Sequence, residues 1–285
     1  MLKLSVPIAK EDALPSAFVV WRGFKESIPK AAEFGYDGVE LALHRADDVD
    51  SAMLDNLLDN NKLCVSAIST GQVFADGGLY LTHEDAAIRK QTVHILLELV
   101  ELAGKYGQIL NLGRVRGSIS SKRSRDYFLE NVRILCEAAT KNGTTIVLEP
   151  VNRYEINFIN NLDEGAELIR RSGLKNLKLM PDVFHMNIED DCIYRSLERN
   201  SNYVHYVHLA DSNRLAPGNG HLDFTEIFAS LKKINYSGWV SAEVLPKPSP
   251  DEAAKQAATQ LLSYIRKYNK LVCSSEKLSM KELLF

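Results

Sequence analysis

The stretch "NGTTIVLEPV", residues 142–151, carries three structural signals within one short segment. Gly143 is a typical helix-stop residue, the run "TIVL" after Thr144 is β-branched and apolar, and Glu149 ends that run with a charge. A short apolar run with such boundaries is typical of a buried strand in a parallel sheet. The stretch therefore predicts a strand that follows one helix and leads toward the next.

The same pattern recurs along the whole chain. Segments with apolar residues at three- and four-residue spacing separate the apolar runs, and this spacing is typical of amphipathic helices. Units of roughly 30 to 35 residues of this kind fit a parallel (β/α)8 barrel. The eight runs are "KLSVPIA" near residue 4, "GVELAL" near 40, "LCVSAIS" near 66, "ILNLGRV" near 111, "TIVLEPV" near 147, "LKLMPDV" near 179, "YVHYVHLA" near 206 and "WVSAEVL" near 242.

These repeats predict an α/β protein with a single (β/α)8 TIM barrel over residues 1–270. A doubly wound open sheet of eight strands is the alternative. Helix signals agree with the repeat, since Ser249 and Glu252 form a capping box around Pro250. Residues 271–285 end in apolar side chains, and we expect this tail to pack on the barrel or on a partner subunit.

Composition and charge exclude several classes of partner. Of 285 residues, 34 are basic and 37 acidic, which gives a formal charge of -3 and no field that favours nucleic acid or an anionic membrane. The four cysteines show no CxxC spacing, which argues against a zinc knuckle or a disulfide framework. The chain shows neither a signal-peptide pattern nor a run of about 18 apolar residues, so we predict a cytoplasmic enzyme.

Ionisable residues stand at the carboxyl ends of four consecutive predicted strands. They are Glu149, Asp182, His208 and Glu243, each beside apolar neighbours. An isolated buried carboxylate is unfavourable unless it pairs with a cation. One interpretation is that each pairs separately with a nearby Arg or Lys. The other is that all four hold one divalent ion, Mn2+, Co2+ or Mg2+, with Zn2+ as an alternative.

Four segments carry a resemblance to a known family. They are "VLEPVNRYE", "LMPDVFHM", "YVHYVHLADSNR" with the following "PGNGHLDF", and "WVSAEV". The chain resembles the xylose isomerase-like TIM barrel superfamily. Within it, the chain is most similar to the ketose 3-epimerases of the tagatose 3-epimerase type and to related sugar-phosphate isomerases and epimerases.

The resemblance implies roles for individual residues. It implies that Glu149, Asp182, His208 and Glu243 bind one metal ion, and that the two glutamates also act as acid and base. It implies that His185, Arg214 and Glu155 contact the substrate. The chain would then be a metal-dependent epimerase or isomerase of a ketose or ketose phosphate, and homodimers or homotetramers are expected by analogy.

The expected reaction removes a proton next to a carbonyl through a metal-bound cis-enediolate. Glu149 and Glu243 come from different strands, so they could approach the substrate from opposite sides. If both act, a stereocentre is inverted; if one acts, a proton moves between neighbouring carbons. The alternatives are a dehydratase of a cyclic keto-sugar of the inosose type and a barrel that binds sugar or metal without turnover.

Several other polar residues leave two interpretations open. Arg114 and Arg116 could receive a substrate phosphate, as could the loop around Gly218 and Gly220, or they are structural. Glu40 and His44 either position the far end of the substrate or satisfy one another. The ion pairs Arg153 with Glu155 and Arg214 with Asp211 are the structural alternatives for those residues. Trp21 and Phe74 are expected in loops, either lining a pocket or packing.

Overall fold

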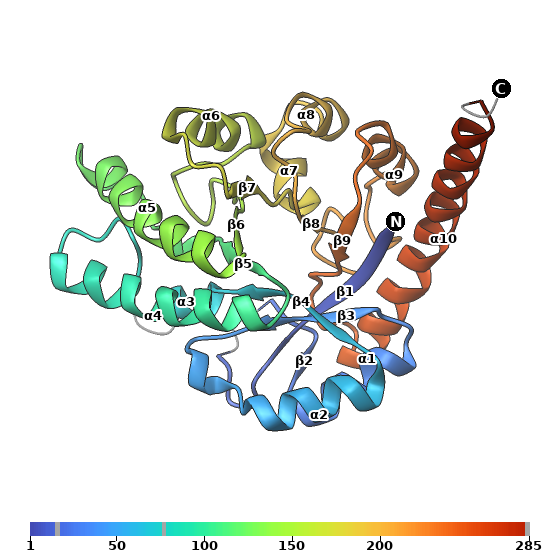
Figure 1. The fold of residues 1–285 in the computed structure, drawn as a ribbon, viewed down its shortest axis with the longest axis horizontal. Helices are drawn as coiled ribbons and strands as arrows, with labels where there is room; N and C mark the ends of the chain where they lie inside the picture. The colour runs from blue at the N-terminus through green and yellow to red at the C-terminus, as the bar shows by residue number, and fades with distance from the viewer. Residues whose placement is uncertain (15–17, 76–77, 283–285) are drawn as a thin grey trace.

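The computed structural model describes residues 1–14, 18–75 and 78–282, with side chains described up to residue 272. Eight parallel strands from these residues form the wall of a barrel, with the helices around its outside (Figure 1). The predicted fold is confirmed. The strands are β1 (Leu2–Ala9), β3 (Gly38–Ala42), β4 (Cys64–Ser69), β5 (Ile109–Leu112), β6 (Thr145–Leu148), β7 (Leu177–Leu179), β8 (Val207–His208) and β9 (Gly238–Ser241).

The strands are paired in the order β7-β6-β5-β4-β3-β1-β9-β8, so neighbours along the chain are neighbours in the sheet. Parallel bridges from Leu179 to Val204 and from Asp182 to His208 join the two ends of this order. A doubly wound sheet would reverse its strand order, so that alternative is wrong. All eight carboxyl ends therefore meet at one rim of the barrel.

One short strand was not predicted. β2 (Trp21–Arg22) pairs with the end of β1 at Ile8 and Ala9. Trp21 is therefore buried in a strand rather than placed in a loop, and its Nε1 donates a hydrogen bond of 2.7 Å to Asp251 at the start of the last helix. Trp21 therefore packs between β2 and that helix.

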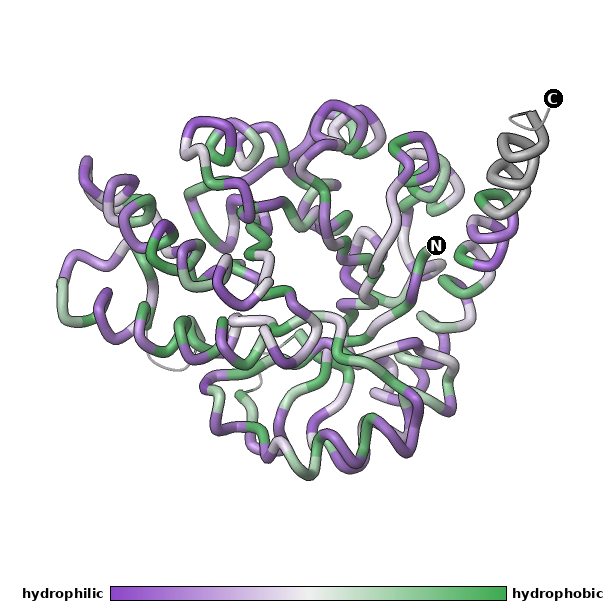
Figure 2. The backbone as a smooth tube through the Cα atoms, in the orientation of Figure 1, coloured by the Kyte–Doolittle hydropathy of each residue, from purple (hydrophilic) through white to green (hydrophobic). Residues whose placement is uncertain are grey.

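Helices follow the strands in turn, and apolar and polar residues alternate along them, as Figure 2 shows for α2 and α4. Gly143 and Gly173 end helices with φ of 75° and 69°, a region that glycine adopts without strain. The helices are α1 (Phe24–Glu33), α2 (Ser51–Asn61), α3 (Gly71–Ala75), α4 (Ala86–Lys105), α5 (Ser124–Asn142), α6 (Leu162–Ser172), α7 (Val183–Glu189), α8 (Ile193–Arg199), α9 (Phe224–Lys233) and α10 (Pro250–Glu282), with 3-10 turns η1 (Ala46–Asp48) and η2 (Arg114–Arg116).

The last helix is longer than the sequence predicts. One half of its predicted capping box forms, because Ser249 Oγ accepts from the backbone N–H of Glu252, while the Glu252 carboxylate accepts from the Ser249 hydroxyl. The helix then continues to Glu282, so the expected boundary at residue 270 falls inside α10. Figure 1 shows its C-terminal part extending past the other helices. Among the described residues, no helix is both long and apolar enough to cross a membrane.

A fully buried arginine ties the loop after β6 to the barrel rim. Arg116 in η2 has no exposed surface, and its guanidinium donates hydrogen bonds of 2.7 to 2.8 Å to the carbonyl oxygens of Gly113, Glu149, Phe158 and Ile159. Burial lowers the pKa of Arg116 to about 10, opposed by the charge of Glu149, so the side chain stays protonated at neutral pH. Arg116 is structural, because it is fully buried and four of its five N–H donors already bind carbonyl oxygens.

We expect Arg116→Met to lower the free energy of unfolding by roughly 3 kcal/mol or more, because each buried acceptor left without a donor costs about 1–3 kcal/mol. The neighbouring Arg114→Met is the matched control, since Arg114 is partly exposed and makes only a long ion pair with Glu155 and ring contacts with Phe18 and Phe74. Its effect should stay below about 1 kcal/mol. Urea unfolding measures both, and equal midpoints for wild type and Arg116→Met would contradict the role of this clamp.

Candidate metal centre and active site

The structure brings the four predicted strand-end residues together. One ligand atom from each of Glu149, Asp182, His208 and Glu243 lies within 4.8 Å of the others. Glu149 directly follows β6, Asp182 precedes α7, His208 ends β8 and Glu243 lies just after β9. The first three are buried and Glu243 is nearly so. The four residues therefore form one cluster, in which Asp182 and Glu243 also pair with Arg214.

Local structure orients Asp182 toward this cluster. It is the N-cap of α7, and its Oδ1 accepts a hydrogen bond of 2.9 Å from the backbone N–H of Phe184. The other oxygen, Oδ2, lies 3.9 Å from Nδ1 of His208. Helix capping thus occupies one oxygen and leaves the other for the cluster.

The hydrogen bonds of His208 show which ring nitrogen faces the cluster. Its Nε2 lies 2.9 Å from Oε2 of Glu40, and a carboxylate can only accept, so Nε2 carries a proton. Nδ1 makes no hydrogen bond to a described residue. It lies 3.3 Å from Oε2 of Glu243 and 3.5 Å from Oε1 of Glu149. This is the orientation of a histidine that ligates a metal through Nδ1.

The charges in the cluster shift each other's pKa. Burial lowers the pKa of His208, but the carboxylates of Glu40 and Glu149 outweigh it and raise that pKa well above the usual range. Burial raises the pKa of Glu149, yet the imidazole of His208 brings it below its ordinary value. The pKa of Asp182 is lowered too, by Arg214 and two histidines against the effect of burial. The carboxylates of Glu149 and Asp182 are therefore ionised at neutral pH.

Arg214 also contacts the cluster. Its guanidinium forms ion pairs with Asp182 and Glu243 and is almost fully buried. The rings of Phe18 and Phe184 lie 5.2 and 4.8 Å from it. Arg214 does not pair with Asp211, so that structural alternative is wrong. Asp211 instead accepts hydrogen bonds from backbone N–H groups of its own loop.

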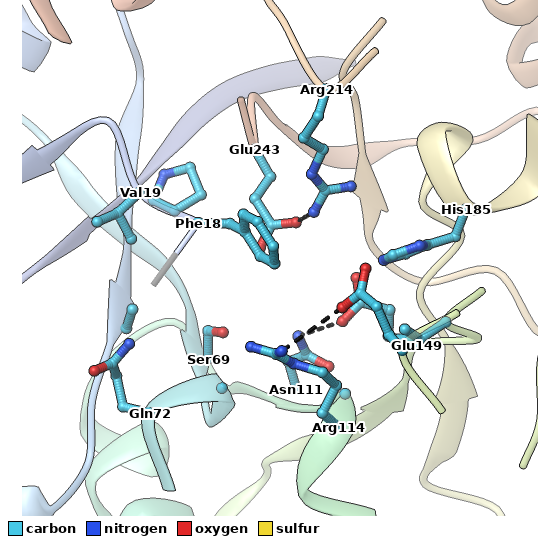
Figure 3. A pocket seen from close by; sticks show the side chains of 16 residues that line it. Phe18, Val19, Ser69, Gln72, Asn111, Arg114, Glu149, His185, Arg214 and Glu243 are labelled. Atoms are coloured by element: carbon cyan, nitrogen blue, oxygen red, sulfur yellow. Dashed lines mark hydrogen bonds and ion pairs between the residues drawn. The ribbon is translucent and has the colours of Figure 1, made fainter. Parts of the chain in front are cut away.

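Arg214 has an uncommon backbone conformation that hydrogen bonds to neighbouring loops hold in place. Its φ is 63°, a conformation that is uncommon for residues other than glycine. The N–H of Arg214 donates to the carbonyl of Asp211 at 2.9 Å, and its own carbonyl accepts from the N–H of Leu245 at 2.8 Å. These bonds join the loops after β8 and β9 and direct the arginine side chain into the pocket (Figure 3).

His185 lines the same pocket with a defined tautomer. Its Nδ1 accepts from the backbone N–H of Asn152 at 3.3 Å, so Nε2 carries the proton. Nε2 lies 3.7 Å from Asp182. Burial lowers the pKa of His185 although Asp182 opposes this, so the ring is neutral. His185 can donate one hydrogen bond from Nε2 toward a bound molecule.

Glu155 lies on the pocket wall, partly exposed. Its Oε1 accepts from Nδ2 of Asn152 at 3.2 Å, and its Oε2 lies 3.7 Å from Arg114. The predicted pair of Arg153 with Glu155 is wrong, because Arg153 turns away and pairs with Glu189 at 2.8 Å. All seven predicted site residues thus gather at the pocket or directly beneath it.

Sequence reasoning missed Asn111 and Phe18. Asn111 is buried at the end of β5, lines the pocket and donates from Nδ2 to Oε2 of Glu149 at 3.2 Å (Figure 3). An asparagine inside an otherwise apolar strand was the available signal. Gly113 leaves room for this arrangement, since a Cβ there would come within 2.7 Å of the Glu149 carboxylate. Phe18 had no distinctive pattern.

Glu40 and His44 do not satisfy one another as one interpretation held. Glu40 bonds His208 beneath the cluster, whereas His44 lines a second cavity of about 150 Å3. That cavity shares Ala42 and Gln72 with the main pocket. Lys10 lies in it and pairs with Asp48 at 2.8 Å. The barrel rim therefore has an inner region at the cluster and an outer polar region.

The donor set fits one divalent metal ion. Three carboxylates and one imidazole nitrogen converge, and Nδ1 of His208 is a buried atom without a hydrogen bond. Oxygen-rich sites with one imidazole suit Mn2+, Co2+ or Mg2+ and also accept Zn2+.

Comparison with known proteins agrees with the fold. The family model described as xylose isomerase-like TIM barrel matches residues 28–268. A 3-dehydro-D-guloside 4-epimerase from Escherichia coli (strain K12) is 30% identical over 225 residues, covering 74% of this chain and 83% of that protein. An L-ribulose 3-epimerase from Methylomonas sp. (strain DH-1) is 32% identical over 226 residues, covering 78% of each.

A solved structure gives the same result. The crystal structure of D-allulose 3-epimerase from Methylomonas sp. in complex with D-allulose superposes with a TM-score of 0.79 at 25% identity, and it covers 94% of this chain and 97% of that one. The chain is therefore an enzyme of the isomerase and epimerase class and belongs to the xylose isomerase-like TIM barrel family.

Proposed function

We propose that this enzyme epimerises a ketose or related keto-sugar at the carbon next to the carbonyl, with one divalent ion held by Glu149, Asp182, His208 and Glu243. The observation that carries the proposal is the placement of two glutamates from different strands at one cluster, beside the donors His185 and Arg214. Figure 3 shows Glu149 and Glu243 on different sides of the pocket.

The names of the relatives support this chemistry. A ketose has its carbonyl at C2 and is inverted at C3 by a 3-epimerase, whereas a 3-dehydro sugar has its carbonyl at C3 and is inverted at C4 by a 4-epimerase. In both cases the inverted carbon adjoins the carbonyl, where a proton can be removed. The two reactions therefore require the same arrangement of bases.

The residues of this chain would have the following roles in the reaction. One glutamate removes the proton from one face of the substrate and the other returns a proton to the opposite face. The lowered pKa of Glu149 keeps it ionised as a base, and Asn111 holds its carboxylate. His185 and Arg214 donate hydrogen bonds to the substrate oxygens that gain charge. A divalent ion, when bound, supplies Lewis acidity to the same oxygens.

The surroundings of the pocket favour an unphosphorylated sugar. Each Lys or Arg that lines the two cavities already pairs with a carboxylate: Lys10 with Asp48, Arg114 with Glu155, and Arg214 with two cluster acids. The Gly-rich loop is occupied as well, since the N–H of Gly218 donates to Asp211. A phosphate group would have to displace one of these carboxylates.

Glu149→Gln and Glu243→Gln should each slow epimerisation by at least about 100-fold, because each removes one acid/base group. In D2O, each variant should still exchange the proton of one epimer, and the two variants should act on opposite epimers. NMR of D-allulose, D-fructose and methyl 3-dehydro-D-glucoside at saturating Mn2+ measures this. Glu189→Gln is the control, because this carboxylate pairs with Arg153 and does not line the pocket.

Other outcomes of this experiment would change the proposal. If both variants retained wild-type epimerisation, the acid/base assignment would be wrong. If both lost exchange with the same epimer, one base would act and an aldose product would identify an isomerase. A product that has lost a hydroxyl group would identify the dehydratase.

Asp182→Asn should weaken binding of the metal ion while preserving the helix cap, because the amide oxygen can still accept from Phe184. For a metal-stripped wild type we expect Mn2+ at 100 times its Kd to stabilise the fold by about 2.7 kcal/mol. The same Mn2+ concentration should stabilise Asp182→Asn much less in thermal unfolding. Asp163→Asn, on the surface of α6, should respond as wild type does, and an equal response of both variants would argue against the cluster as the metal site.

D-Allulose should be a better substrate than D-allulose 6-phosphate, with kcat/KM higher by at least about tenfold (1.4 kcal/mol), because no unpaired Lys or Arg lines the described pocket to receive the phosphate. Steady-state assays on both sugars at equal Mn2+ concentration measure the ratio. Preference for the phosphate, lost in Arg114→Gln, would show that Arg114 leaves Glu155 to bind it.

A further inference from the structure

The buried carboxylate of Glu40 lies outside the cluster and contacts the far edge of the His208 ring. Glu40 lies in β3, is fully buried, and its Oε2 is 2.9 Å from Nε2 of His208, which is also fully buried. The cluster lies on the opposite edge of the imidazole ring, at Nδ1. Glu40 thus touches the cluster only through His208.

The environment of Glu40 makes a purely stabilising role a poor explanation. In the part of the chain that the structure describes, Glu40 bonds the side chains of His208 and Tyr206, and its Oε1 has no hydrogen bond. A buried charge that is only partly satisfied contributes little to stability, and an apolar residue of similar volume often serves as well. An apolar residue at position 40 would lose the hydrogen bond to His208.

A chain of hydroxyl groups fixes the Glu40 carboxylate from below. The hydroxyl of Tyr206 donates to Oε2 of Glu40 at 3.1 Å. It also lies 2.7 Å from Oγ of Ser66, which in turn lies 2.6 Å from Oγ of Ser5. These residues come from or lie next to strands β1, β4 and β8, so the barrel interior supports the carboxylate from several sides.

We propose that Glu40 is a positioning residue that holds His208 in the ring orientation and tautomer needed for metal ligation through Nδ1. The proposal rests on the metal site of the proposed function. Glu40 accepts a hydrogen bond from the Nε2 N–H, so Nδ1 is the nitrogen that faces the cluster and that would give up its proton to ligate a metal ion. Without this acceptor, the ring can rotate or carry its proton on Nδ1, and either change removes the nitrogen ligand.

Two substitutions at Glu40 separate its acceptor role from its charge. Glu40→Gln keeps an oxygen that can accept from Nε2 but removes the negative charge, and we expect Mn2+ affinity to fall about tenfold. Glu40→Ala removes the acceptor as well, and we expect the affinity to fall by up to about 100-fold. The Kd for Mn2+ is measured by calorimetry on the metal-stripped full-length protein, independently of catalysis.

Ser5→Ala is the matched control from the same buried layer. Ser5 bonds the far end of the hydroxyl chain and does not contact Glu40, so this variant should keep the wild-type Kd even where its stability falls. A second readout follows the tautomer. In 15N-labelled, Zn2+-loaded wild type, NMR should place the His208 proton on Nε2, and Glu40→Ala should lose this signature.

The outcomes distinguish this inference from the proposed function. If wild type binds Mn2+ and Glu40→Ala binds it equally well with an unchanged tautomer, Glu40 has no positioning role and the metal site stands. If Glu40→Ala fails to fold, the Kd and tautomer of Glu40→Gln decide the matter. If wild type itself binds no divalent ion, the metal site and the role of Glu40 are both overturned.

Discussion

The site depends on one electrostatic constraint, the convergence of three carboxylates on a rim that is nearly closed to water. Glu149, Asp182 and Glu243 repel one another at this distance, so the fold must supply positive charge among them. His208 lies between them and Arg214 contacts two of them. A divalent cation bound among the carboxylates would meet the same requirement.

The fold could be predicted in nearly all respects because its signal is periodic and local. Each strand is a short apolar run. Each helix has apolar residues along one face and a residue that marks its end. The strand ends also placed the four cluster residues, since parallel strands in chain order bring their carboxyl ends to one rim. The short β2 and the full length of α10 were missed, because neither a two-residue pairing nor a tail beyond the barrel changes the pattern of apolar residues.

The sequence predicts which residues form the site better than it predicts which of them contact one another. The sequence shows that Glu40, Asn111 and Arg116 follow or lie in strands, but not which residue on a neighbouring strand each will meet. Glu40 reaches His208 across the barrel interior, and Asn111 reaches Glu149 from the adjacent strand. Such pairings depend on strand register and side-chain direction, which no spacing in the chain encodes. The resemblance to ketose 3-epimerases supplied roles for His185 and Arg214, and their geometry is compatible with those roles.

The clamp made by Arg116 has a consequence for how this barrel could acquire new specificity. Because one side chain binds carbonyls on both sides of the loop after β6, that loop behaves as part of the scaffold and carries Glu149 and Asn152 with it. Changes there would disturb catalysis and folding together. Among the described residues, no buried arginine of this kind joins the outer cavity around Lys10 and His44 to the cluster. Selection for a different sugar, in nature or in the laboratory, has more freedom there than at the clamped loop.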